Sequence, residues 1–394
     1  MNPTEVRKDF PQLKDGHIYF DSAATSLKPL PVIEAVNYYY TKLSANVERG
    51  LHRPSHFATR MYEEAHHRLL KFINGTGEVI FTKNCTEAIN LIAHGLDWKE
   101  GDEIITTFLE HNSNLLPWFY LRRRGVRVTL IRCDSEGLID LDELSRSISS
   151  RTRLIALTHA SNVLGTIQPI SSVVEIAHRR GVKVLVDGAQ AAPHLKLDLD
   201  SLGCDFYAAS GHKMLGPSGT GFLFIRDGVI GEVNPCLLGG GTVKDVDLDQ
   251  IILADGFERY EAGTPNIAGG IGLGAAVDYL ERIGMENVRS HELELTGYAI
   301  EKLKTIKGIR IHGPQDPRKK TGVVAFSLPK IPSHRVAIIL DEVGGIAVRS
   351  GYHCAFLLTR NILKEDLGTA RASFYIYNTK EEIDQMVEVL EEIV

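Results

Sequence analysis

The sequence has no long apolar run and no excess of positive charge. No stretch approaches the length of a membrane-spanning helix, and the opening segment MNPTEVRKDF lacks the apolar core of a signal peptide. The 394 residues carry a formal net charge of -6, with a pI near 6.2, which argues against nucleic acid as the main partner. We therefore expect a cytoplasmic protein that binds neither membrane nor nucleic acid.

Cysteine pairs and a dinucleotide fingerprint are also missing. The five cysteines are scattered without a CxxC pair, which fits neither a zinc site nor a disulfide framework and suits a reducing compartment. The turn Gly239-Gly240-Gly241 opens no clear helix and lacks the spacing of a dinucleotide-binding loop. A Rossmann dehydrogenase is therefore disfavoured.

Strand-like and helix-like segments alternate through the first two thirds of the chain. Strand-like runs occur at 103–107, 126–131, 154–159 and 182–186, with helical patterns between them, and the apolar run 154–159 is typical of a strand buried on both faces of a parallel sheet. We expect an α/β fold, with a large domain over 16–277 whose mainly parallel central sheet has flanking helices. We expect a smaller α+β domain over 278–394, together with 1–15, and a hairpin-like excursion at 242–258.

Lys213 follows the strand-like run 205–209. Its turn, Ser210-Gly211-His212-Lys213, is at the carboxyl end of that strand, where open α/β sheets bind ligands. A partly desolvated lysine there has a lowered pKa and can form a Schiff base with an aldehyde. Taken alone, the segment fits a solvated loop lysine better, so the assignment depends on the rest of the chain.

Other strand ends carry residues that suit a flat, charged ligand. Asp187 ends an apolar strand and needs a cationic partner, such as a protonated pyridine nitrogen. Thr86, where a helix begins, suits phosphate binding or serves only as an N-cap. His111 suits stacking on a ring or a purely structural role.

A set of short motifs occurs in a fixed order over nearly the whole chain. They are Thr86-Glu87, Glu110-His111, Ser161-Asn162, Asp187-Gly188-Ala189-Gln190, Ser210-Gly211-His212-Lys213, Gly263-Thr264-Pro265-Asn266, Arg349-Ser350-Gly351-Tyr352-His353-Cys354-Ala355 and Arg371-Ala372-Ser373. The set resembles the class V aminotransferase branch of fold-type-I pyridoxal-phosphate enzymes. Within that branch it is similar to cysteine desulfurases of the SufS/CsdB group, which includes selenocysteine lyases.

The resemblance implies a site for pyridoxal 5'-phosphate in the large domain. Lys213 would hold the cofactor covalently and act as general base and acid. The other cofactor contacts implied are Asp187 to the ring nitrogen, Gln190 to the phenolic oxygen, His111 stacked on the ring, Asn162 nearby, and Thr86, Ser210, His212 and Thr264 at the phosphate. Thr264 would come from the partner subunit of a homodimer.

The resemblance also implies that L-cysteine is converted to L-alanine. Asn162, Arg349 and Arg371 would bind the substrate. Cys354, in a polar loop of the smaller domain, would take the sulfur as a persulfide, aided by a nearby cation such as Arg349 or His353. The sulfur would supply iron–sulfur cluster assembly or other thio-cofactors through an acceptor or scaffold protein.

Two departures from the group leave the substrate preference open. Tyr352 replaces the first of two paired histidines, and Glu48 stands where some relatives have histidine. L-selenocysteine therefore stays an alternative substrate. Another class V enzyme, an aminotransferase or epimerase, would keep Lys213 without needing Cys354. A non-catalytic scaffold carrying the cofactor in a cluster-assembly complex would keep the fold and lose turnover.

Overall fold

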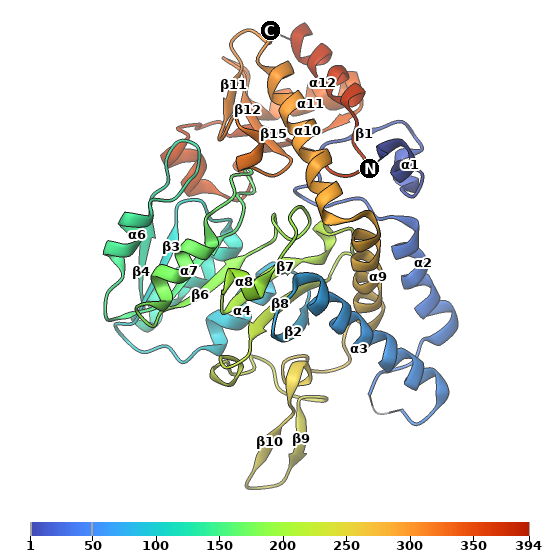
Figure 1. Ribbon diagram of the computed structural model, residues 1–394, viewed down its shortest axis with the longest axis vertical. Helices are drawn as coiled ribbons and strands as arrows, with labels where there is room; N and C mark the ends of the chain where they lie inside the picture. The colour runs from blue at the N-terminus through green and yellow to red at the C-terminus, as the bar shows by residue number, and fades with distance from the viewer. Residues whose placement is uncertain (1, 49, 394) are drawn as a thin grey trace.

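The computed structural model describes residues 2–48 and 50–393, and its largest element is a seven-stranded sheet (Figure 1). In spatial order its strands are β2 (Gly77–Thr82), β8 (Gly221–Arg226), β7 (Phe206–Ser210), β6 (Lys183–Asp187), β5 (Thr152–Thr158), β3 (Glu103–Thr107) and β4 (Arg127–Ile131). The strands from β7 to β4 are parallel, and β8 is antiparallel to both of its neighbours. The expected mainly parallel sheet is confirmed.

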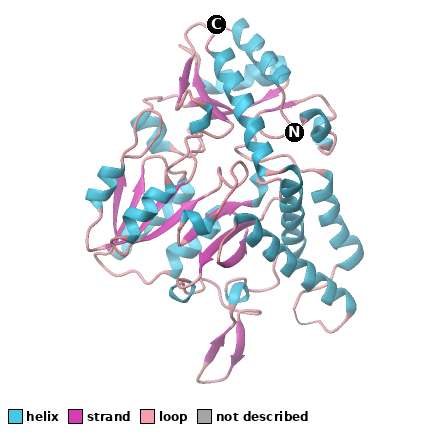
Figure 2. Ribbon diagram, viewed as in Figure 1, coloured by secondary structure: helices cyan, strands magenta, loops and turns pink. Residues whose placement is uncertain are grey.

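Helices cover both faces of this sheet, as Figure 2 shows. One face packs against α4 (Cys85–Gly95) and α5 (Leu116–Leu121). The other packs against α3 (Arg53–Ile73), α6 (Leu141–Ser147), α7 (Ile170–His178), α8 (Leu199–Leu202) and α9 (Ile267–Ile283), with α2 (Leu30–Tyr38) beside α9. Side chains alternate between faces along a strand, so Ile104 and Ile105 of β3 join different cores.

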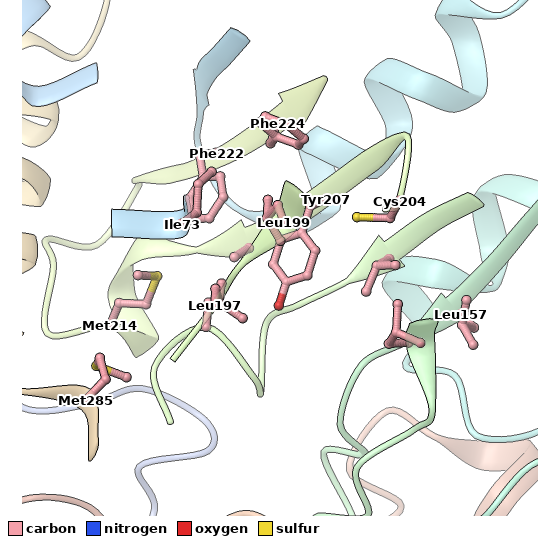
Figure 3. Close-up of a cluster of buried hydrophobic side chains, with 14 of the residues drawn as sticks. Ile73, Leu157, Leu197, Leu199, Cys204, Tyr207, Met214, Phe222, Phe224 and Met285 are labelled. Atoms are coloured by element: carbon pink, nitrogen blue, oxygen red, sulfur yellow. The ribbon is translucent and has the colours of Figure 1, made fainter. Parts of the chain in front are cut away.

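The core beneath the Lys213 turn is dense with large side chains. Tyr207 of β7 and Phe222 and Phe224 of β8 are fully buried there, together with Met214 (Figure 3). Burying an apolar side chain of this size stabilises the fold by roughly 1.5–3 kcal/mol. Met214 therefore anchors the turn that carries its neighbour, Lys213.

A second, four-stranded antiparallel sheet lies at the opposite end of the molecule from the hairpin of β9 (Val243–Val246) and β10 (Ile251–Leu253) (Figure 1). Its order is β11 (Arg310–His312), β12 (Val323–Ser327), β15 (Thr369–Ser373) and β14 (Arg349–Gly351). It packs with α10 (Met285–Leu303), α11 (Ser333–Gly344) and α12 (Lys380–Glu392). Arg349 and Arg371 both lie in strands of this sheet, which the sequence does not predict, because these short strands lack apolar alternation.

The N-terminal segment joins the two sheets. It holds α1 (Pro3–Arg7) and then β1 (Ile18–Tyr19), which pairs in parallel with β13 (Ile346–Ala347). Asp21 then forms a bridge with Ser373 of β15. Residues near 20 therefore lie beside residues near 372.

The excursion expected at 242–258 contains a hairpin, β9 (Val243–Val246) with β10 (Ile251–Leu253), which projects from the molecule (Figure 1).

Among the described residues, no helix combines the length and apolarity needed to cross a membrane.

Helix α12 begins with a capping box. The Thr379 hydroxyl accepts from the Glu382 backbone N–H, and the Glu382 carboxylate accepts from the Thr379 backbone N–H at 3.1 Å. We expect Thr379→Ala to lower the free energy of unfolding by about 1 kcal/mol, because helix N–H groups lose their acceptor. Chemical denaturation measures this, with Thr379→Ser as the control that keeps the hydroxyl. Equal destabilisation by both changes would show that the cap contributes nothing.

Candidate active site

A cavity of about 470 Å³ lies where the parallel strands end. Of the candidate residues, it is lined by Thr86, His111, Asn162, Asp187, Gln190, Ser210, His212, Lys213, Arg349, Cys354 and Arg371. These residues lie in strands of both sheets or in the segments that follow those strands. Parts of the chain that are far apart in sequence therefore build one site. Thr264 lines a separate cavity of about 340 Å³, with Lys83 and Glu87.

Asp187 and Lys213 form the charged centre of the cavity. Burial lowers the pKa of Lys213, and the negative charge of Asp187 opposes that shift. One Asp187 oxygen accepts from the Ala189 backbone N–H at 3.0 Å and from the Cys85 thiol at 3.2 Å. Burial raises the pKa of Cys85 well above its usual value, so its thiol keeps the proton it donates. The arrangement suits an amine nucleophile beside a fixed carboxylate.

His111 presents a neutral ring to the cavity. Burial and the charge of Lys213 lower its pKa to about 4. Its Nδ1 accepts from the Ser113 backbone N–H at 3.1 Å, which places the ring proton on Nε2. The Ser113 hydroxyl also lies 2.6 Å from the Thr86 hydroxyl. His111 and Thr86 are thus held together by one serine.

The first turn of α4 lines the cavity and is a candidate anion site. Asn84 is the N-cap of this helix, with its side chain accepting from Glu87, so the N-cap alternative for Thr86 is wrong. The Ser210 hydroxyl accepts from the Cys85 backbone N–H at 3.0 Å. Burial lowers the pKa of His212 to about 4. A helix N-terminus with neutral polar side chains around it suits a phosphate.

Arg371 also lines the cavity and is 3% exposed. Its Nη1 donates to the Asn162 carbonyl at 2.9 Å, and its Nη2 donates to Asp21 at 3.0 Å. Its buried Nε has no hydrogen-bond partner. Arg371 lines the cavity, and a guanidinium with an unused donor suits a planar carboxylate.

The Cys354 loop is held over the cavity through its backbone. The Asn162 amide donates to the His353 carbonyl at 2.7 Å, and the Asn112 backbone N–H donates to the Cys354 carbonyl at 2.7 Å. His353 and Cys354 both have left-handed backbones, with φ of 51° and 57°. The Cys354 side chain is exposed. The loop thus presents a thiol to the cavity on a constrained turn.

His353 is not the cation expected beside Cys354. Burial lowers its pKa well below the usual value, so the ring is neutral, and its Nε2 donates to the Thr369 carbonyl at 3.0 Å. Burial decides this charge, and the loop sequence does not show it. Arg349 is the remaining cation of the expected pair.

The two departures from the family pattern do not face the cavity directly. Tyr352 stacks on Phe356 and its hydroxyl donates to the Asp366 carbonyl. The backbone N–H of Glu48 donates to Thr59, and Glu48 is not among the residues that line the cavity.

The residues present fit pyridoxal 5'-phosphate. The buried side-chain oxygen of Gln190 has no hydrogen-bond partner. The Nε2 of Gln190 donates one proton to the Ala23 carbonyl at 2.7 Å, which leaves its second N–H unused. A ligand that carries a phenolic oxygen beside a ring would meet this amide. The N–H groups of a helix N-terminus suit a phosphate, and the Asp187 carboxylate suits a pyridinium N–H as its acceptor.

Sequence reasoning missed several residues of the site. Asp21, Ala23, Cys85 and Ser113 contact candidate residues directly. Cys85 and Ser113 lie next to or near Thr86 and His111 in the chain, so proximity was a usable signal. Asp21 and Ala23 lie far from their partners in sequence, and only the pairing of distant segments reveals them.

The family follows from comparison with known proteins. The model of the family described as aminotransferase class-V matches residues 18–386. The chain belongs to the class-V aminotransferase family. It is 44% identical over 396 residues to a probable cysteine desulfurase of Methanothermobacter thermautotrophicus, covering 100% of this chain and 98% of that one.

Solved structures of class-V enzymes agree. The apo structure of a cysteine desulfurase from Thermococcus onnurineus matches with a TM-score of 0.95 and 43% identity, covering 100% of this chain and 98% of that one. A lysine-to-alanine mutant of the enzyme C-DES, with glycine linked to its PLP cofactor, matches with a TM-score of 0.85 and 25% identity, covering 98% and 99%. The chain is a fold-type-I enzyme of the cysteine desulfurase group and depends on pyridoxal 5'-phosphate.

Proposed function

We propose that this chain converts L-cysteine to L-alanine and takes the sulfur as a persulfide on Cys354. The observation that carries the proposal is that Cys354 lines the same cavity as Lys213, Asp187 and Arg371. An aminotransferase or an epimerase needs the lysine but has no use for an exposed thiol at this place. The thiol therefore favours sulfur transfer over the other class-V reactions.

The cofactor contacts follow the geometry of the cavity. Lys213 would attach the cofactor, Asp187 would pair with its ring nitrogen and Gln190 would bond its phenolic oxygen. His111 would stack on the ring, and Asn162 would lie beside it. Thr86, Ser210 and His212 would bind the phosphate at the N-terminus of α4. When bound, pyridoxal 5'-phosphate withdraws electrons from the substrate carbon skeleton.

Arg371, Asn162 and Arg349 would bind the substrate carboxylate. Arg371 offers an unused Nε–H, and the Asn162 amide now bonds the His353 carbonyl. Lys213, whose pKa burial lowers, would then move the proton of the substrate α-carbon, because an uncharged amine accepts a proton readily.

Cys354 would act as a thiolate on the substrate sulfur. A bond forms between the two sulfur atoms, and the bond between the substrate β-carbon and its sulfur breaks, its electron pair staying with the carbon. Protonation of that carbon gives alanine, and Cys354 keeps the persulfide. Cysteine plus one protein thiol thus gives alanine plus one protein persulfide, with no external oxidant or reductant.

A homodimer would complete the site. Thr264 lines a cavity separate from that of Lys213, so its phosphate contact would have to come from the partner subunit. The exposed position of Cys354 suits transfer of sulfur to an acceptor or scaffold protein for cluster assembly or other thio-cofactors. All five cysteines carry free thiols, in keeping with the cytoplasm.

We also propose a division into two units. The large unit, 16–277, would bind the cofactor, and 278–394 with 1–15 would form the smaller unit that carries the Cys354 loop. The two separate sheets support this division, as does an apolar core formed mostly by residues 295–390.

The test of this function is an assay of purified holoenzyme with L-cysteine and a thiol reductant, following alanine and sulfide together. We expect equal amounts of both, because reduction of the persulfide releases one sulfide for each alanine. Pyruvate or D-cysteine instead would indicate another class-V reaction. A protein that binds the cofactor and forms neither product, even with an added thiol acceptor, would be a scaffold, and the proposed activity would be wrong.

A further inference from the structure

Two arginines face each other at the substrate end of the cavity. Arg349 of β14 and Arg371 of β15 are direct partners in the antiparallel ladder, and both line the cavity. Like charges directly opposite each other across a pair of strands destabilise the sheet. Arg371 is also almost fully buried, where an unpaired charge is costly. This pair therefore needs a counter-charge.

Asp21 supplies that counter-charge from the opposite end of the chain. One of its oxygens accepts from Arg371 Nη2 at 3.0 Å, and the other lies 3.6 Å from Arg349 Nε. Its backbone is fixed by a bridge to Ser373, two residues after Arg371, and the Ser373 N–H bonds the Phe20 carbonyl. The carboxylate is thus placed between the two guanidinium groups by the pairing of distant segments.

Asp21 also determines which edge of Arg371 faces the substrate. The Asn162 carbonyl takes Nη1, and Asp21 takes one proton of Nη2. Three N–H groups remain, one each on Nε, Nη1 and Nη2, and Nε and Nη2 share one edge of the planar group. Two parallel donors on one edge match a carboxylate.

The charge balance follows from the same contacts. Two guanidinium groups and one carboxylate leave a single positive charge at this end of the cavity. The influence of Asp21 extends to Lys213, whose pKa it raises while Arg371 lowers it. The α-carboxylate of one substrate molecule neutralises the remaining positive charge. A second anionic group on the substrate would then have no unpaired cation among Arg349, Arg371 and Asp21.

We propose that Asp21 is a positioning residue that presents one edge of Arg371 to the substrate carboxylate and, by cancelling one arginine charge, sets the preference for amino acids with a single anionic group. The inference rests on the proposed substrate site. It goes beyond it by assigning selectivity to a residue that need not touch the substrate.

The test is a titration of holoenzyme variants with L-alanine and with L-aspartate, followed by the change in cofactor absorbance. For Asp21→Asn we expect L-alanine to bind about tenfold more weakly, because a charged hydrogen bond that orients Arg371 is replaced by a neutral one. We expect the ratio of L-aspartate to L-alanine affinity to rise about tenfold, because the site gains one net positive charge. Turnover of L-cysteine should show a raised KM with a smaller change in kcat.

A second variant separates charge from structure. Adding Arg349→Gln to Asp21→Asn restores the single positive charge, so the affinity ratio should return toward that of the wild type. Asp9→Asn is the matched control, because Asp9 lies 3.7 Å from Arg282 and accepts from Tyr279, away from the cavity. Its ratio should not change.

Asp21→Asn keeps an oxygen for Arg371 Nη2, so the fold should survive, and thermal unfolding checks this. A folded Asp21→Asn protein with an unchanged affinity ratio would overturn the role of Asp21, as would a ratio that the double variant leaves raised. Wild-type holoenzyme whose absorbance responds to neither amino acid would overturn the proposed substrate site itself, and the role of Asp21 with it. These titrations need no sulfur chemistry, so a failure of the Cys354 proposal would be seen separately.

Discussion

Lys213→Ala is expected to abolish turnover of L-cysteine and covalent attachment of the cofactor. The loss in kcat should be at least about 10³-fold, because one change removes both the anchoring amine and the group that moves the α-carbon proton. Borohydride treatment followed by denaturation and mass measurement should leave the cofactor bound to wild-type protein and not to the variant. The phosphate contacts proposed for Thr86, Ser210 and His212 do not involve this side chain, so noncovalent binding should persist.

Lys28 provides the control for this experiment. Burial lowers its pKa to about 8, and its Nζ donates to the His212 carbonyl at 2.9 Å, so it is a second poised amine close to the turn. It is not among the residues that line the cavity. Lys28→Gln should keep the cofactor fixed by borohydride. If the Lys213→Ala protein is still labelled, and labelling ends only when Lys28 is also changed, the anchoring role of Lys213 is wrong.

We expect Cys354→Ala to lower the rate of sulfide release from L-cysteine at least about 10²-fold, because the change removes the proposed acceptor of the sulfur. The absorbance of the bound cofactor and its response to L-alanine should stay as in the wild type, because the hydrogen bond from the Asn112 N–H to the Cys354 carbonyl does not depend on the side chain. Sulfide and alanine release in the presence of reductant measures the first effect. Titration with L-alanine measures the second.

Cys236 is the matched control, because its side chain is also exposed and free. It lines the cavity of Thr264 and lies outside that of Lys213. Cys236→Ala should release sulfide at the wild-type rate. After incubation with L-cysteine and no reductant, mass measurement of the wild type should show one added sulfur on the peptide that contains Cys354. If the Cys354→Ala protein releases sulfide at the wild-type rate, the proposed persulfide on Cys354 is wrong.

The large sheet could be predicted because strands that are buried on both faces have recognisable apolar sequences. Runs such as 154–159 and 182–186 are apolar on both faces, and polar residues mark each strand end. Parallel strands bring those ends to one edge, which is why Asp187, His111 and Lys213 meet in one cavity. The resemblance to a family then supplied the roles, which local patterns could not.

The rest of the site depends on pairing that no local pattern encodes. Strands β14 and β15 are short and lack apolar alternation, so the local sequence pattern does not predict them as strands. Asp21 contacts Arg371 across 350 residues of sequence, and nothing near Asp21 marks that contact. The charge of His353 was also mispredicted, because it depends on burial beneath strand β15 and on the carbonyl of Thr369. Both failures concern environment rather than residue type.

The bridge between Asp21 and Ser373 has a consequence for how the protein is made. Synthesis delivers Lys213 and the whole seven-stranded sheet well before Arg371, and contacts between distant segments form late and slowly. A chain still on the ribosome therefore carries Lys213 before it carries Arg371. The proposed substrate site would be complete only when the last strand meets the first, so we expect a chain that lacks strand β15 to release no sulfur from L-cysteine.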